Sequence, residues 1–249
     1  MTPSHISSYQ QSTEGFYTSK VNSPSNLPVK TFLPVYYEPN YAYPLLVFLH
    51  GHGSSEDSVL RYAPHISRRN FIAISLRGRQ EVTIQKNGKF EEGYSWGSQA
   101  QSDAWVEDYL FNAIEKTRDF YHIHSRRIYL VGFCEGATLA YRMALQFPEQ
   151  FAGMVSLNGC LPRQQRPLWR VNQMRHIKLF MGHGVANSVI PMGMALEDRL
   201  QFQMAGVEPC WRTYGTNHRL HVEMFKDTNR WIMGHVEKDW HGTPSFFKG

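Results

Sequence analysis

Val131-Gly132-Phe133-Cys134-Glu135-Gly136 is the stretch that decides how this chain folds. Residues 127–131 before the turn are apolar enough to predict a buried strand, and residues 137–145 after it predict a helix. The pattern G-x-C-x-G suits a sharp strand-to-helix turn, because residues without side chains avoid a clash while one side chain is lifted above the sheet. The alternative is an ordinary turn of a doubly wound sheet with a half-buried cysteine, and this stretch alone does not separate the two.

Strands and helices alternate along most of the chain. Strands are predicted at 30–37, 43–49, 71–76, 127–131, 154–159, 177–182 and 206–214, and helices at 103–120, 137–145, 192–205 and 221–236. The run at 43–49 is continuously apolar, as is typical of a strand in a parallel sheet that is covered on both faces. The alternation therefore predicts an α/β fold with a mostly parallel central sheet and helices on both faces.

Two segments that follow predicted strands have the composition of functional loops. His50-Gly51-His52-Gly53 ends the strand at 43–49, where backbone N–H groups can face a developing negative charge. Its two histidines would suit a metal pair, but no third ligand lies at suitable spacing, and we expect no metal and no other cofactor. Residues 77–102 are predicted to form a long loop above the sheet, in which Tyr94 and Trp96 either contact the substrate or only hold the loop in place.

Composition sets the broad class of protein. The 249 residues suffice for one domain at 29–249, and the polar residues 1–28 are expected to be a loose or covering extension. The net charge of +5 is scattered, which favours solvated surface over nucleic-acid binding. Three cysteines form no disulfide framework, and no signal peptide or run of membrane-spanning length is present, which favours the cytoplasm. The oligomeric state is not indicated.

Several motifs in order resemble the carboxylesterase/phospholipase-like esterases of the α/β-hydrolase superfamily. They are LLVFLHGHG (45–53), VGFCEG (131–136), HGVANSVIP (183–191) and YGTNHRLHVE (214–223), and the resemblance covers about residues 30–236. It implies the α/β-hydrolase fold, with G-x-C-x-G as a nucleophile elbow. Dienelactone hydrolases, a related family, also carry cysteine in the elbow.

The resemblance also implies site residues. Cys134 takes the position of the nucleophile, and His218, before the last helix, takes that of the catalytic histidine. Asn187 occupies the position at which the family's H-G-x-x-D-x-x-x-P turn carries the triad aspartate. Backbone N–H groups of His52 and Glu135 would form the oxyanion hole.

Alternatives remain for each member of this triad. His221 is a second candidate for the base. Asn187 also suits a turn, in which case Glu197 or Asp198 would have to supply the acid. Cys134 would also fit an engineered replacement of serine, although its pairing with an asparagine argues against a single trapping substitution.

The residues indicate acyl transfer through a thioester intermediate. A thiol is more acidic than a serine hydroxyl, and beside an imidazolium it can rest as thiolate, which leaves the asparagine only to orient the ring. With water as acceptor, the protein would hydrolyse a small-molecule ester, thioester or lactone. The alternatives are an acyltransferase that uses an amine or alcohol, and a binding protein that has kept the fold and lost catalysis.

Overall fold

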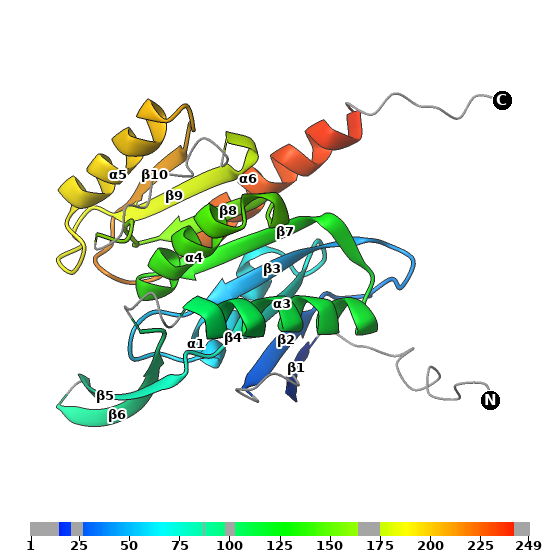
Figure 1. Cartoon of the computed structure of the whole chain (residues 1–249), viewed down its shortest axis with the longest axis horizontal. Helices are drawn as coiled ribbons and strands as arrows, with labels where there is room; N and C mark the ends of the chain where they lie inside the picture. Colours follow the sequence, from blue (N-terminus) through cyan, green and yellow to red (C-terminus); the bar gives the residue numbers. More distant parts are fainter. Residues whose placement is uncertain (1–14, 21–26, 87, 98–102, 164–174, 242–249) are drawn as a thin grey trace.

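A computed structural model describes residues 15–20, 27–86, 88–97, 103–163 and 175–241, which form one layered domain around an eight-stranded sheet (Figure 1). Its strands, in chain order, are β1 (Gly15–Lys20), β2 (Pro28–Leu33), β3 (Tyr43–Leu49), β4 (Ile72–Leu76), β7 (Ile123–Phe133), β8 (Gly153–Leu157), β9 (Lys178–Gly184) and β10 (Cys210–Tyr214). In space the order is β1-β2-β4-β3-β7-β8-β9-β10. β2 runs antiparallel to β1 and β4, whereas the six neighbouring strands β4, β3, β7, β8, β9 and β10 are parallel to one another.

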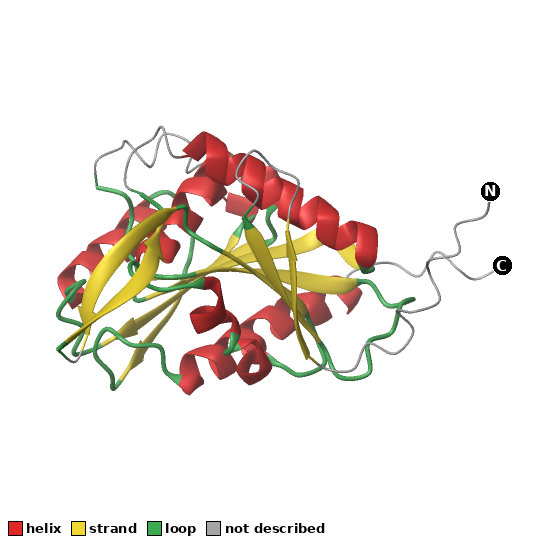
Figure 2. Ribbon diagram, turned by 90° about the horizontal axis from the view of Figure 1, so that it is seen from below, coloured by secondary structure: helices red, strands yellow, loops and turns green. Residues whose placement is uncertain are grey.

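Helices cover both faces of this sheet (Figure 2). They are α1 (Glu56–Leu60), α2 (Ala63–Ile66), α3 (Asp103–Phe120), α4 (Glu135–Gln146), α5 (Met192–Met204) and α6 (Val222–His241). Successive residues of β7 point to opposite faces: Leu130 packs in the cluster under α3, α4 and α5, and Val131 in the cluster under α1, α2 and α6. The predicted α/β-hydrolase fold, with a mostly parallel sheet between two helical layers, is confirmed.

The expectation of a structureless loop at 77–102 was wrong. Strands β5 (Gln80–Lys86) and β6 (Lys89–Ser95) form an antiparallel hairpin that projects from the sheet (Figure 1). Most of its side chains are exposed or half-buried, so it has no continuous apolar run to reveal it. The sequence does hold the dipeptide Asn87-Gly88, the favoured turn of a two-residue hairpin, and Gly88 has φ +76°.

Three further elements were not expected. β1 lies within the polar extension and adds an edge strand to β2, while residues 1–14 and 21–26 of that extension lie outside the described residues. α1 and α2 fill the connection between β3 and β4, and Ser55 begins α1 with a reciprocal capping box to Ser58. Within the part of the chain that the structure describes, no helix is both long and apolar enough to cross a membrane.

Candidate active site

Cys134 occupies a strained turn between β7 and α4. Its backbone has φ 54° and ψ −119°, a conformation that residues with a side chain rarely adopt, and its N–H donates to Leu157 O of β8 at 3.1 Å. The neighbouring glycines are required: a Cβ on Gly132 would lie 2.4 Å from Ala137 Cα, and a Cβ on Gly136 would lie 2.1 Å from Leu49 O. The packing therefore enforces the turn that holds the thiol at the carboxyl edge of the sheet.

The thiol of Cys134 faces two backbone donors. Burial raises the pKa of this thiol, and hydrogen bonds from the backbone N–H groups of Glu135 and His52 offset only part of that effect. These are the two amides expected to form the oxyanion hole, and they converge on the sulfur that would carry the reacting carbonyl. The raised pKa favours the thiol over the thiolate, and the thiolate beside an imidazolium that the sequence suggested stays a prediction.

His218 is held by Asn187. The imidazole Nδ1 lies 2.9 Å from Asn187 Oδ1, which also accepts from the backbone N–H groups of Val189 at 3.1 Å and Ile190 at 3.0 Å. Because backbone N–H groups only donate, the amide atom at this position is the oxygen, and His218 must carry its hydrogen on Nδ1. The lone pair on Nε2 is then available as a base. Burial lowers the pKa of His218, which favours the neutral ring.

The ring of His218 lies next to the elbow. Its centroid is 5.2 Å from that of Phe133, the residue directly before Cys134. Asn187 is buried with 6% of its surface exposed, while His218 is half-buried. The late turn and the β10–α6 connection therefore bring both residues to the end of the sheet at which β7 presents the cysteine.

The alternative residues for the base and the acid lie elsewhere. His221 is exposed, and its Nδ1 accepts from Glu223 N at 3.3 Å, at the start of α6. Asp198 is fully buried but accepts from Leu161 N at 2.8 Å and pairs with Arg163 at 2.9 Å. Glu197 is exposed on α5. None of these three residues has a contact with His218 among the interactions of the described residues.

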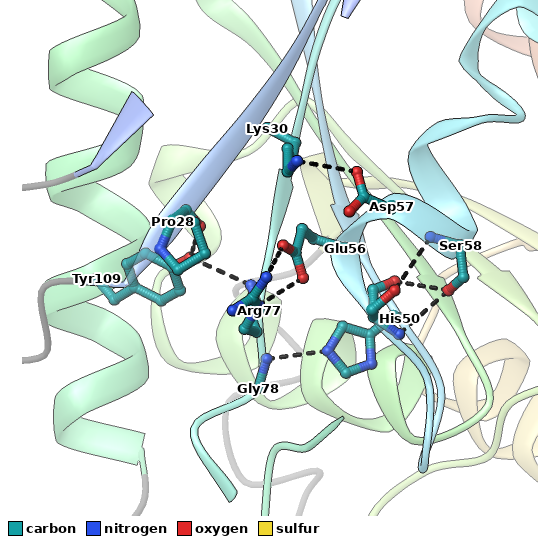
Figure 3. Close-up of polar contacts among 10 residues, drawn as sticks. Pro28, Lys30, His50, Glu56, Asp57, Ser58, Arg77, Gly78 and Tyr109 are labelled. Atoms are coloured by element: carbon teal, nitrogen blue, oxygen red, sulfur yellow. Dashed lines mark hydrogen bonds and ion pairs between the residues drawn. The ribbon is translucent and has the colours of Figure 1, made fainter. Parts of the chain in front are cut away.

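The turn that carries the His52 amide is fixed from below by a polar cluster (Figure 3). His50 donates from Nδ1 to Gly51 O at 2.8 Å and accepts at Nε2 from Gly78 N at 2.9 Å. Both ring nitrogens are occupied, and His50 and His52 do not form the metal pair considered above. Beyond the turn, the fully buried carboxylate of Glu56 is held by the guanidinium of Arg77 through two hydrogen bonds.

The two aromatic residues expected near the substrate differ in exposure. Trp96 is completely buried, donates its indole N–H to His50 O at 2.8 Å and stacks against Trp105. It holds the loop in place and has no surface to offer a substrate, so its assignment to substrate binding was wrong. Tyr94 is half-buried, and Cζ of the Arg77 guanidinium lies over its ring, 4.6 Å from the ring centroid. The backbone of Tyr94 forms an isolated β-bridge with that of Ser54.

The side-chain contacts of two polar residues near Cys134 and Asn187 were not anticipated: those of Glu135, expected only for its backbone N–H, and those of Asn158. The carboxylate of Glu135 accepts from Ser95 Oγ at 2.7 Å and lies 3.6 Å from the exposed His52 imidazole. The side chain of Asn158, directly after β8, forms hydrogen bonds with the Asn187 side chain and with the backbone of Gly184 and Arg219. Its place at the carboxyl end of a parallel strand was the available signal, because such ends meet at one edge of the sheet.

Comparison with known proteins fits this geometry. A sequence model of the phospholipase/carboxylesterase family matches residues 35–236. The chain belongs to this family. Membership of the phospholipase/carboxylesterase family agrees with the α/β-hydrolase fold described above.

The individual proteins that this chain resembles share little sequence identity with it. A stretch of 124 residues is 27% identical to a putative esterase, NocK, of Nocardia uniformis subsp. tsuyamanensis, and the match spans 48% of this chain and 33% of that protein. A carboxylesterase from Mesorhizobium loti superposes with a TM-score of 0.68 at 16% identity, over 87% of this chain and 99% of its own. The Bacillus cereus carboxylesterase gives 0.56 at 15% identity, over 90% and 95%. At these identities the solved structures establish the fold.

Proposed function

We propose that this protein is a cysteine-nucleophile hydrolase that cleaves an ester, thioester or lactone through a thioester acyl-enzyme. The observation that carries the proposal is the Cys134 thiol, which is held in the strained elbow and faced by the N–H groups of His52 and Glu135. Those two donors would hold the oxyanion of a tetrahedral intermediate formed on this sulfur.

His218 and Asn187 supply the proton transfers in this proposal. As the Cys134 sulfur attacks the carbonyl carbon, its proton passes to Nε2 of neutral His218, and the same nitrogen then protonates the leaving group. His218 next removes a proton from water, which attacks the thioester and releases the acid together with the free thiol. Asn187 orients the ring through the 2.9 Å bond but supplies no negative charge.

An asparagine in place of the triad aspartate is consistent with a thiol as the nucleophile. In a serine enzyme, replacing the triad aspartate by asparagine lowers kcat about 10⁴-fold. A thiol is far more acidic than an alcohol and needs far less help in losing its proton. The pair Cys134 and Asn187 is therefore a workable combination, whereas an asparagine beside a serine nucleophile would be a poor one.

The experiment measures hydrolysis of p-nitrophenyl acetate together with the intact mass of the quenched enzyme. We expect Cys134→Ala to abolish both turnover and the acetyl adduct, which adds about 42 Da to the chain. Cys160→Ala is the matched control, because Cys160 is also a half-buried free thiol near the site. Undiminished turnover in Cys134→Ala, or an adduct that persists there, would overturn the proposal.

A further inference from the structure

Asn158 joins the two loops that carry the candidate acid position and the candidate base. It follows β8 in a left-handed conformation with φ 51°, which asparagine tolerates, and its side chain is completely buried. Its Nδ2 donates to Arg219 O at 3.0 Å, in the loop of the catalytic histidine. Its Oδ1 accepts from Gly184 N at 2.8 Å and from Asn187 Nδ2 at 3.3 Å.

The orientation of both amides is fixed by backbone groups. A backbone N–H from Gly184 can bond only to the oxygen of Asn158, and a backbone carbonyl from Arg219 can bond only to its nitrogen. Asn158 therefore presents a carbonyl oxygen to residue 187, and only a donor satisfies it there. In Asn187 that donor is Nδ2, which leaves Oδ1 for the His218 ring.

We propose that Asn158 is a positioning residue of the active site: its carbonyl oxygen accepts from Asn187 Nδ2 and, together with the Val189 and Ile190 N–H groups on Oδ1, holds the Asn187 amide in the orientation that keeps His218 as the Nδ1–H tautomer. This inference rests on the proposed function of Cys134, His218 and Asn187. If the Asn187 amide rotated by half a turn, an N–H would face Nδ1, and the ring would have to move its hydrogen to Nε2. The base would then have no lone pair to offer the thiol.

The same contact makes the site selective for asparagine over aspartate at position 187. The ionised carboxylate that Asn187→Asp introduces has no donor, so one of its oxygens would face the carbonyl oxygen of Asn158 at about the 3.3 Å seen for the amide. Both groups are buried, which leaves water unable to separate them. Restoring the carboxylate that the family turn usually carries would thus disturb this site.

The first test reads the tautomer directly. In ¹⁵N NMR spectra of the labelled full chain at neutral pH, we expect the neutral His218 ring to carry its hydrogen on Nδ1. Asn158→Ser removes the acceptor of Asn187 Nδ2 and should populate the Nε2–H tautomer as a minor form, because the Val189 and Ile190 N–H groups still hold Asn187 Oδ1. Thr117→Val, which removes a buried hydroxyl hydrogen-bonded to Ala113 O on the distant helix α3, is the destabilising control and should leave the spectrum unchanged. An unaltered tautomer in Asn158→Ser would overturn the inference.

The second test is a double-mutant cycle on p-nitrophenyl acetate hydrolysis. We expect Asn158→Ser and Asn187→Asp each to lower kcat roughly 10-fold with little change in KM, because the ring and not the substrate site is disturbed. Adding Asn158→Ser to Asn187→Asp should raise kcat again, since the opposed carbonyl oxygen is gone. Additive losses, or a faster Asn187→Asp single variant, would refute the selectivity.

The two tests separate this inference from the proposed function. Turnover that survives Cys134→Ala would remove the nucleophile yet leave the tautomer result standing. Loss of turnover in Cys134→Ala, combined with a His218 tautomer indifferent to residue 158, would keep the nucleophile and reject the role of Asn158.

Discussion

Arg77→Met tests the support beneath the oxyanion turn. Glu56 begins α1 shortly after the His50–Gly53 turn, and its carboxylate is completely buried. Arg77 holds it with a hydrogen bond from Nε to Oε2 at 2.7 Å and a second one from Nη2, as Figure 3 shows. Methionine preserves much of the length of the side chain and removes both donors, which strands the carboxylate without a partner.

The expected loss of stability follows from the unequal exposure of the two partners. Leaving a buried charge unpaired costs about 3–5 kcal/mol. The Arg77 side chain is 27% exposed, and water can approach the vacated space, which places the loss at the lower end, about 3 kcal/mol. For a chain of this length that corresponds to a fall in Tm of roughly 6–12 °C.

Thermal and urea unfolding of three variants provide the measurement. Glu56→Gln should be milder than Arg77→Met, because the abandoned guanidinium can reach solvent. The double variant Glu56→Met/Arg77→Met should recover most of the loss, since a buried pair replaced by apolar side chains leaves no unpaired charge. If Arg77→Met costs under about 1 kcal/mol, or if the double variant is the least stable, the pairing is not what holds this turn.

Four further predictions concern the site and its surroundings. Burial lowers the pKa of His218 from its ordinary 6.5, so its neutral form persists to lower pH, and the acid limb of the kcat/KM profile should lie below pH 6.5. Burial raises the pKa of Cys134 above its ordinary 9.0, so the rate of iodoacetamide labelling should still be rising at pH 9. A labelling rate that levels off near neutral pH would contradict the second prediction. Trp96→Phe should lower stability by about 1–3 kcal/mol through the unpaired His50 carbonyl, with KM unchanged, whereas a raised KM at unchanged Tm would restore a substrate role. Gly136→Ala should lower stability by about 3 kcal/mol or more, because its Cβ would meet Leu49 O at 2.1 Å; a folded variant of ordinary Tm would show that the elbow can relax.

Local patterns were enough to predict the framework of the fold. The helix expected at 103–120 has those bounds in the structure, and the apolar strand at 43–49 is β3. The hairpin β5–β6 escaped prediction because its alternating apolar residues are few and only half-buried, and its position depends on contacts with the β3–α1 turn. Hydrophobic periodicity reports burial, and this segment is mostly exposed.

Within the site, the resemblance of the motifs to the esterase family predicted roles for Cys134, Asn187 and His218, but it did not predict the groups that contact them. The pKa of the Cys134 thiol is raised by burial, which the sequence does not display. Asn158 was included in a predicted strand at 154–159, yet the strand ends at Leu157 and the asparagine turns away in a left-handed conformation. Its contacts join loops 26 and 61 residues away, a relation that no local pattern contains.

The two ends of the hairpin β5–β6 differ in how closely they pack against the turn that carries the His52 amide. At its base Gly93 packs so closely that a Cβ would lie 2.2 Å from Gly53 O, and Tyr94 bridges to Ser54. Toward its far end Phe90 is 77% exposed and a Cβ on Gly88 would meet nothing within 4 Å. Near that end Ile84 still packs against Gly53, because a Cβ on Gly53 would lie 2.4 Å from Ile84 Cγ2. Substitutions or insertions confined to residues 88–90 should therefore extend the surface beside the site without displacing the turn that carries the His52 amide.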